Sequence, residues 1–148
     1  MKIGLEMHFQ LPTRSKLFCP CPTAPAEPNH NICPVCLGYP GSKPSLNRKA
    51  LEIGLGIDQF LDCRIEERVW FSRKTYFYPD LPKNFQITQY ETPLGTDGRF
   101  ELNGRSIGIW RVHLEEDPGR IRRVGRPGEE IAFVDYNRSG IPLVEIVT

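Results

Sequence analysis

The sequence lacks the features that would place the protein in a membrane, in an export route or among generally basic nucleic-acid-binding proteins. No apolar run approaches the roughly 20 residues that span a bilayer. The start, Met1 to His8, holds no long apolar segment and carries Glu6 early. With 19 basic and 18 acidic residues the net charge is +1, which permits only a local basic patch. We therefore expect a cytoplasmic protein with no membrane partner.

Phosphate-binding glycine loops are also missing. The sequence contains neither a G-x-x-x-x-G-K-[ST] loop nor a G-x-G-x-x-G loop. A bound nucleotide would therefore be held by metal ions and a sheet rather than by a loop at a helix N-terminus. Internal repeats and low-complexity segments are absent as well, and 148 residues suffice for one domain with a core.

The five cysteines do not suggest a disulfide framework, because their number is odd and no export signal precedes them. Four form two close pairs, Cys19 with Cys21 and Cys33 with Cys36, in a stretch rich in Pro, Asn and Gly. Two such pairs suit a tetrahedral Zn²⁺ site whose positions are all filled by thiolates, so we expect a structural ion. The alternative is a set of free buried thiols. Cys63 stands apart, and we expect it to pack in the core.

The pattern of apolar residues predicts an α+β domain that is mainly an antiparallel sheet with few helices. Residues 2–11 alternate as a strand does, and residues 46–61 repeat at helical spacing after Ser45, a candidate N-cap. Residues 12–44 lack periodicity and are predicted to form a loop organised by the cysteines. Hairpin turns are predicted at residues 96–98 and 103–104. Further strands are predicted at residues 63–71, 85–90, 105–114, 131–135 and 143–147, which gives one helix and about seven strands.

Acidic side chains occur in three predicted strand segments. Glu6 and His8 are two residues apart and share one face of the first strand. Glu115 and Glu116 are neighbours and point to opposite faces, so periodicity does not choose between them. Glu145 lies inside an apolar run near the end of the sequence. Together the three segments make an active site plausible, whereas each alone would be an ordinary solvated face.

Glu145 has the strongest need for a partner. Burying an unpaired carboxylate costs more than a strand can offset. Mg²⁺ is a suitable partner, because it takes oxygen ligands and stays bound to substrate phosphates. The alternatives are an ion pair with Arg111 or Arg138, or exposure on a one-sided sheet.

Two basic segments are candidates for phosphate contact. Lys74 precedes the aromatic run at residues 76–78, whose rings could stack on a base. The alternative is a packed aromatic turn. Residues 120–126 carry four arginines among glycines, and we expect a turn that is either solvated or in contact with nucleic-acid phosphate.

Five motifs carry a resemblance to a known family. They are Ile3–His8 (IGLEMH), Tyr76–Lys83 (YFYPDLPK), Gln86–Tyr90 (QITQY), His113–Gly119 (HLEEDPG) and Asp135–Thr148 (DYNRSGIPLVEIVT). In this order, along essentially the whole chain, they resemble the GatB family, the B-type subunits of the aspartyl/glutamyl-tRNA amidotransferases. The Cys-Pro-Cys and Cys-Pro-Val-Cys-Leu-Gly segments are similar to those of its zinc-bearing branch.

The resemblance implies a ligase that uses ATP and Mg²⁺. Such an enzyme phosphorylates the side-chain carboxylate of Asp or Glu misacylated onto tRNA(Asn) or tRNA(Gln), and ammonia from glutamine then displaces the phosphate. The implied partners are subunits A and C, in a heterotrimer, and the misacylated tRNA. The implied fold is a cradle related to glutamine synthetase, with a zinc-binding insertion at about residues 17–42. The chain would be the N-terminal part of this catalytic domain, without the C-terminal helical and tail domains, and we expect it to be inactive alone.

The resemblance also selects residues. It favours Glu116 over Glu115, which periodicity cannot do. Phosphoryl transfer needs neutralised charge and aligned groups more than a protein nucleophile, which agrees with such a site. The implied Mg²⁺ ligands are Glu6, His8, Glu116 and Glu145, and the candidate contacts for phosphate or substrate are Lys74 and Arg138.

Two other functions stay open. One is that of the paralogue GatE, which acts on Glu-tRNA(Gln) only. The compact Cys-Pro-Val-Cys-Leu-Gly-Tyr-Pro-Gly segment favours GatB over GatE. The other is that of a non-catalytic zinc module which binds tRNA or a protein.

Overall fold

The computed structural model of the chain describes residues 3–148 and has the predicted α+β architecture, with antiparallel strands predominating. Neither of the two helices in this part of the chain is long and apolar enough to cross a membrane. The elements are β1 (Glu6–Gln10), α1 (Pro34–Leu37), α2 (Arg48–Phe60), β2 (Arg64–Ile65), β3 (Ser72–Thr75), β4 (Phe85–Thr88), β5 (Gly95–Leu102), β6 (Arg105–Glu116), β7 (Arg120–Val124), β8 (Ile131–Asp135) and β9 (Pro142–Val147).

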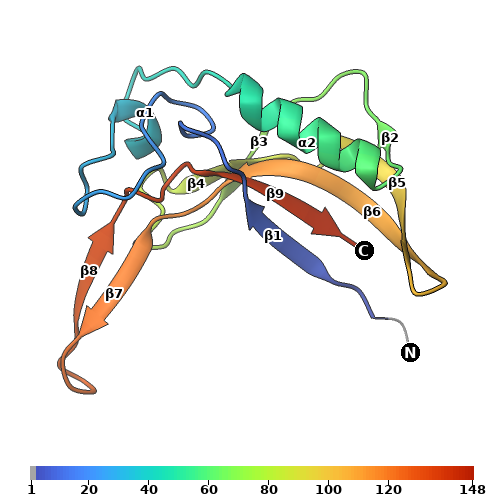
Figure 1. The fold of residues 1–148 in the computed structure, drawn as a ribbon. Helices are drawn as coiled ribbons and strands as arrows, with labels where there is room; N and C mark the ends of the chain where they lie inside the picture. The colour runs from blue at the N-terminus through green and yellow to red at the C-terminus, as the bar shows by residue number, and fades with distance from the viewer. Residues whose placement is uncertain (1–2) are drawn as a thin grey trace.

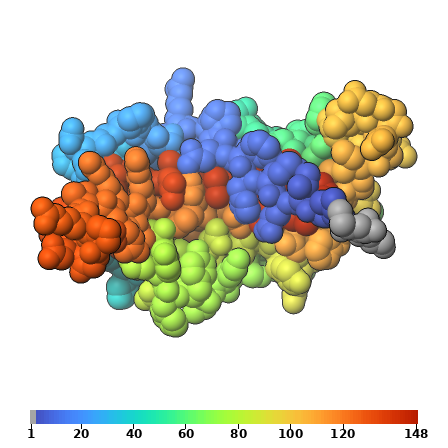
Figure 2. All heavy atoms as spheres, turned by 90° about the horizontal axis from the view of Figure 1, so that it is seen from below, coloured from blue at the N-terminus to red at the C-terminus, as the bar shows by residue number. Residues whose placement is uncertain are grey.

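A five-stranded antiparallel sheet in the order β1-β9-β6-β5-β2 forms the body of the domain. β9 lies between β1 and β6, so segments from both ends of the sequence are neighbours in the sheet (Figure 1). α2 covers one face of this sheet, and Figure 2 looks onto the other side, where β1 and β9 reach the surface. The β7-β8 hairpin extends from one end of the body.

The start of α2 differs from the sequence prediction. Ser45 is not the N-cap, because α2 begins only at Arg48, three residues later. The Asn47 side chain takes that role and accepts hydrogen bonds from the N–H groups of Lys49 (2.9 Å) and Ala50 (3.3 Å). An asparagine in this position satisfies two amides that the helix leaves unpaired.

The core lies between α2 and the sheet. Leu94, Val112, Leu114 and Val144 are at most 1% exposed there. Gly54 of α2 meets these side chains directly, since a β-carbon at this position would lie 2.5 Å from Leu94 Cδ1. The glycine that weakens the helix in isolation therefore permits its close packing on the sheet.

One of the two predicted hairpin turns is confirmed. Asn103 and Gly104 both have positive φ (51° and 75°) and join β5 to β6, as a two-residue turn requires. The turn predicted at residues 96–98 is wrong, because both Thr96 and Gly98 pair with β6 inside β5. Gly98 is needed for packing, since a β-carbon there would overlap Cys63.

Three other segment predictions need correction. The first strand spans only Glu6–Gln10, and position 2 of the predicted strand lies outside the described residues. Of the strand predicted at residues 63–71, only β2 forms. The backbone leaves the sheet after Glu66, and the less exposed side chains of this segment do not alternate as in a strand. The arginine-rich segment is not a turn as predicted. Arg120–Val124 is β7, whose backbone pairs with β8 while its arginines stay exposed.

Asp58 of α2 is a buried acid whose carboxylate oxygens accept no hydrogen bond from the described residues. Its side chain is fully buried. It faces Gly95 and Cys63. Burial raises the pKa of its carboxyl from the ordinary value of 3.8 to about 7, and the Cys63 thiol opposes this only in part.

We predict that Asp58→Asn removes a pH-dependent loss of stability. Because the pKa is raised in the folded state, the stabilising contribution of the Asp58 carboxyl to the free energy of unfolding is fully present below about pH 4. It is lost as the pH rises through about 7. Asp58→Asn should therefore be more stable than the wild type at pH 8. Urea unfolding at pH 4 to 8 measures the difference, with Asp62→Asn as an exposed control. Equal pH dependence in the wild type and Asp58→Asn would contradict the prediction.

Candidate metal sites on the sheet and at the cysteine loop

Three polar side chains lie in a row across adjacent strands. His8 is opposite Glu145 in the β1-β9 pair, and Glu145 is opposite His113 in the β9-β6 pair. Residues directly opposite one another in antiparallel strands share a face. Glu6 is two residues from His8 in β1, and Glu115 is two residues from His113 in β6. Both therefore lie on the same face as the row. This face is the one that α2 does not cover, since its neighbours in β6 point into the core.

The five side chains are close enough to interact directly. His113 Nε2 lies 3.0 Å from Glu145 Oε2 and 3.6 Å from Glu115 Oε2. His8 Nε2 lies 3.4 Å from Glu145 Oε2 and 3.2 Å from Glu115 Oε1. Arg111 approaches Glu145 Oε1 at 3.7 Å. The register of three strands thus gathers acids and imidazoles from three distant parts of the sequence.

Neighbouring groups, rather than burial, give the two central carboxyls different pKa shifts. Burial, followed by the adjacent Glu6 carboxyl, raises the pKa of Glu145. Burial acts the same way on Glu115, but a hydrogen bond and positive charge from His113, with a hydrogen bond from Thr88, leave the pKa of Glu115 lowered. Glu145 Oε1 and His113 Nδ1 are buried and have no hydrogen-bond partner in the described residues. The cluster therefore contains polar atoms that protein groups do not satisfy.

The donor atoms have the spacing of a metal site. One oxygen or nitrogen each from Glu6, His8 and Glu145 lie within 4.8 Å of one another, and the same holds for His113, Glu115 and Glu145. Two ligands of one octahedral ion at 2.0–2.1 Å are at most about 4.2 Å apart, so only small adjustments would be needed. Glu145 belongs to both sets. These residues can hold a divalent cation, and carboxylate oxygens are the donors that Mg²⁺ prefers.

A cavity of about 340 Å³ adjoins this cluster. Glu6, Glu115 and Glu145 line it from the main sheet, and Lys74 lines it from β3. β3 pairs with β4, and β4 lies against the end of β6, which places Lys74 at the cavity. The structure thus brings Lys74 together with three of the acids around one cavity.

Two other sequence-predicted residues lie elsewhere. Glu116 points to the opposite face from Glu115, where it forms a buried ion pair with Lys83 and accepts a hydrogen bond from the Ile87 N–H at 3.1 Å. It does not share a cluster with Glu145, since neighbours on a strand alternate in direction. Arg138 donates to the carbonyl oxygens of residues 118 (3.0 Å) and 119 (2.6 Å), so its guanidinium holds the turn after β6.

The four paired cysteines form a second cluster. Their sulfur atoms lie within 4.8 Å of one another, and Cys33 Sγ and Cys36 Sγ are 3.9 Å apart. Four thiolates bound to Zn²⁺ at 2.3 Å in tetrahedral geometry would be about 3.8 Å apart, so the cluster can hold such an ion. The Cys33 N–H also donates to Cys36 Sγ at 3.2 Å, at the start of α1. The other two members are Cys19 and Cys21.

The thiols of this cluster differ in acidity. A hydrogen bond from Cys19 and the Lys16 ammonium lower the pKa of Cys36 to about 4 against the opposing effect of burial. Burial, with a hydrogen bond to Cys33, raises the pKa of Cys21 to about 11. Close thiols cannot all ionise unaided, whereas a bound cation would stabilise all four thiolates. Cys63 lies outside this cluster in contact with the main core, as predicted.

Comparison with known proteins assigns the chain to a family. A family model described as the GatB/GatE catalytic domain matches residues 1–148. The chain belongs to this family. It is 52% identical over 151 residues to the B-type subunit of an aspartyl/glutamyl-tRNA(Asn/Gln) amidotransferase from Moorella thermoacetica, with 99% of this chain and 32% of the relative covered.

A second relative carries the same name. The protein from Halobacterium salinarum is 53% identical over 154 residues, with 99% of this chain and 31% of the relative covered. The chain thus spans about a third of the length of these curated relatives. The resemblance inferred from the motifs to the GatB family is confirmed.

Sequence reasoning misses several residues of the site in this GatB/GatE domain. It weighs Glu115 only against Glu116, and it treats His113 only as part of an acidic motif. Strand alternation alone places His113, Glu115 and Arg111 on one face. The missing information is the register of β6 against β9, which a single sequence does not contain.

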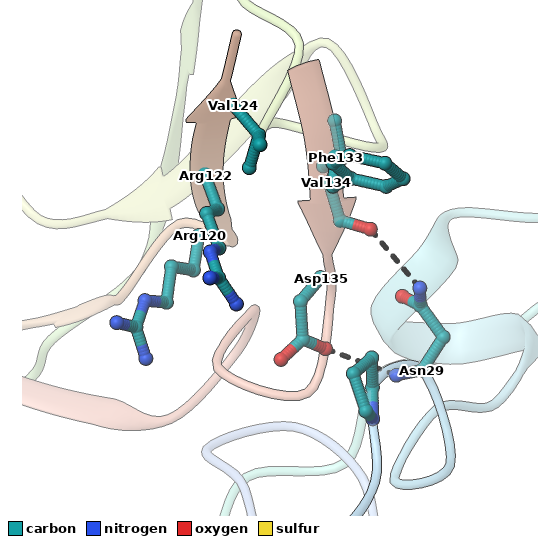
Figure 3. A pocket seen from close by; sticks show the side chains of 8 residues that line it. Asn29, Arg120, Arg122, Val124, Phe133, Val134 and Asp135 are labelled. Carbon is teal, nitrogen blue, oxygen red and sulfur yellow. Dashed lines mark hydrogen bonds between the residues drawn. The ribbon is translucent and has the colours of Figure 1, made fainter. Parts of the chain in front are cut away.

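A further hollow of about 570 Å³ lies between the β7-β8 hairpin and the cysteine loop. Figure 3 shows Arg120, Arg122 and Phe133 on its hairpin side and Asn29 on the loop side. It contains none of the predicted metal ligands.

Glu115→Gln and Glu116→Gln form a matched pair for testing the cluster. With Mn²⁺ as the probe in paramagnetic resonance titrations, Glu115→Gln should weaken binding at least about 10-fold, since a ligand is lost. Glu116→Gln should leave Mn²⁺ binding within about twofold but lower the free energy of unfolding by about 3–5 kcal/mol, because Lys83 then stays buried without its partner. The reverse pattern would show that Glu116 is the ligand.

For the cysteine cluster we predict about one equivalent of Zn²⁺ per chain when the thiols are kept reduced. Elemental analysis after dialysis measures it. Removal of the ion by a chelator should lower the melting temperature, because binding free energy contributes to folding. A zinc content under about half an equivalent would argue against a tight structural site.

Proposed function

We propose that the chain provides the site at which a tRNA-dependent amidotransferase activates a carboxylate with ATP. The substrate is the side chain of Asp or Glu misacylated onto tRNA(Asn) or tRNA(Gln), and the product is the corresponding amide. The proposal follows the names of the relatives, which are amidotransferase subunits for aspartyl- and glutamyl-tRNA. A GatE-type activity, restricted to Glu-tRNA(Gln), is the alternative within the same family.

The observation that carries the proposal is the row of His8, Glu145 and His113 beside a cavity lined by Lys74. A buried carboxylate oxygen without a hydrogen-bond partner, Glu145 Oε1, suits a site that takes up cations with its substrate. Lys74 adds an ammonium on a flexible stem, which suits a phosphate oxygen. The stability of the sheet alone does not require buried acids beside a cavity.

The reaction has two steps. An oxygen of the substrate carboxylate attacks the γ-phosphorus of ATP, the bond to the bridging oxygen breaks, and ADP leaves. Ammonia then attacks the acyl carbon, phosphate leaves, and the nitrogen loses a proton to give the amide. Both steps need alignment and charge neutralisation rather than a protein nucleophile, which explains why no nucleophilic side chain is required.

The residues of the chain have distinct parts in this scheme. Mg²⁺, when bound, neutralises phosphate charge and aligns the reacting oxygens. Glu6, His8, Glu115 and Glu145 would hold it, with Glu115 in the position that the resemblance gave to Glu116. His113 Nε2 lies 3.0 Å from Glu145 Oε2 and would steady the direction of that carboxylate. Lys74 would contact a phosphate.

Ammonia must come from another protein, so we propose partner subunits. The relatives are named as one lettered subunit of an amidotransferase, which implies further subunits in an assembly. We propose subunits A and C, with glutamine as the ammonia donor and the misacylated tRNA as the common substrate. Zn²⁺ at the cysteine cluster would be structural, because its four positions are filled by thiolates.

The test is amidation by the assembled enzyme from misacylated tRNA, glutamine and ATP. Glu115→Gln should lower kcat for tRNA-dependent ADP formation and for amidation together, by about 100-fold or more, because charge stabilisation at the phosphate is lost. Glu101→Gln, on the exposed side of β5, is the control and should change neither rate by more than about twofold.

Two outcomes decide against the proposal. Wild-type rates with Glu115→Gln would rule out catalysis at this cluster. Loss of activity only through weaker tRNA binding, with ADP formation unchanged at saturating tRNA, would favour the non-catalytic zinc module instead.

A further inference from the structure

Lys16 is a buried lysine that forms no ion pair with a carboxylate in the described residues. Its side chain is fully buried, and its ammonium belongs to none of the ion pairs of residues 3–148, since the nearby Glu116 carboxylate pairs with Lys83 instead. Its ammonium donates to the carbonyl oxygens of Asn31 (2.8 Å) and Tyr136 (3.3 Å) and lies 3.5 Å from Cys36 Sγ. The three donors of the ammonium thus meet three acceptors.

Only one of these acceptors can carry a charge. A buried ammonium without a counter-charge is strongly unfavourable. Cys36 supplies a counter-charge only as a thiolate, and four thiolates around Zn²⁺ carry a net charge of about −2. We propose that Lys16 is a positioning residue for the four-cysteine metal site, offsetting this charge and linking the site to the turn at residues 136–140. The proposal rests on the proposed zinc site.

Further hydrogen bonds connect the cysteine loop with this turn. The Leu17 N–H donates to the Gly140 carbonyl at 2.8 Å. The Asn31 N–H donates to Asn137 Oδ1, also at 2.8 Å, and the Tyr136 N–H donates to Asn29 Oδ1 at 2.8 Å. These contacts end on the segment that joins β8 to β9, which the Lys16 ammonium also reaches at the Tyr136 carbonyl.

Asn29 extends the connection to the hairpin. Figure 3 shows its amide reaching the Val134 carbonyl and its backbone reaching the Asp135 carboxylate, each at 3.0 Å. The cysteine loop therefore holds the end of β8 and the turn that leads into β9. When the cysteine loop is ordered, it fixes where β9 begins, and β9 carries Glu145.

The test compares Lys16→Met with Lys43→Met, an exposed lysine of the same loop. Zinc affinity is measured in the full chain by competition with a chromophoric chelator, with the thiols reduced. Lys16→Met should weaken zinc binding about 10- to 100-fold, the range typical of groups that contact metal ligands. Lys43→Met should change it by less than about twofold. Equal affinities for the wild type and Lys16→Met would overturn the proposal.

A double-mutant cycle separates charge from packing. Cys36→His keeps a ligand but removes its negative charge, so Lys16→Met should cost less than about threefold in that background. A loss as large as in the wild-type background would assign Lys16 to packing alone and overturn the charge role. Failure of the wild type itself to bind zinc would instead refute the zinc site on which the inference depends.

Hydrogen exchange tests the link to the turn without changing Lys16. Chelation of zinc from the wild type should speed exchange at the amides of residues 17, 136, 137 and 140, while β5 and β6 keep their protection. This measurement needs no variant, so it tests the link between the metal site and the turn even if Lys16→Met does not fold. Unchanged exchange at the turn after zinc removal would show that the metal site and the turn are independent.

Discussion

The pairing register of β9 between β1 and β6 is the constraint on which the rest of the structure depends. It places Glu145 between His8 and His113, and a shift by one residue would turn Glu145 into the core and an apolar neighbour into the cavity. The apolar side chains on the other face, packed under α2, hold this register. The same packing that stabilises the sheet therefore keeps the acids together on its open face.

Buried charged groups in the described residues have different kinds of partner, and three places show the contrast. Glu116 is paired with Lys83, which makes it a structural ion pair. The Glu145 cluster has unsatisfied polar atoms on an accessible cavity, which suits a cation that arrives with substrate. Lys16 faces thiols, and its charge is balanced only when they are ionised. The partner of each group, rather than its burial, separates structural from functional charges.

Much of the fold could be predicted from the sequence, because alternation and turn chemistry are local. The strand at residues 131–135 and the Asn103-Gly104 turn are correct. The prediction for Ser45 was wrong because Asn47 caps the helix instead. The prediction for residues 63–71 was wrong because the backbone leaves the sheet after β2. Which of Glu115 and Glu116 faces Glu145 depends on pairing between distant strands, and here the resemblance selected the acid on the other face.

The most direct test of the account is to locate a bound cation. Crystals of the chain soaked with Mn²⁺ would show it by anomalous scattering. We predict a manganese peak in contact with Glu145 and with at least one of Glu6, His8 and Glu115. A Mn²⁺ peak at Glu116, or a Glu145 carboxylate closed onto Arg111 with no manganese at the cluster, would contradict it.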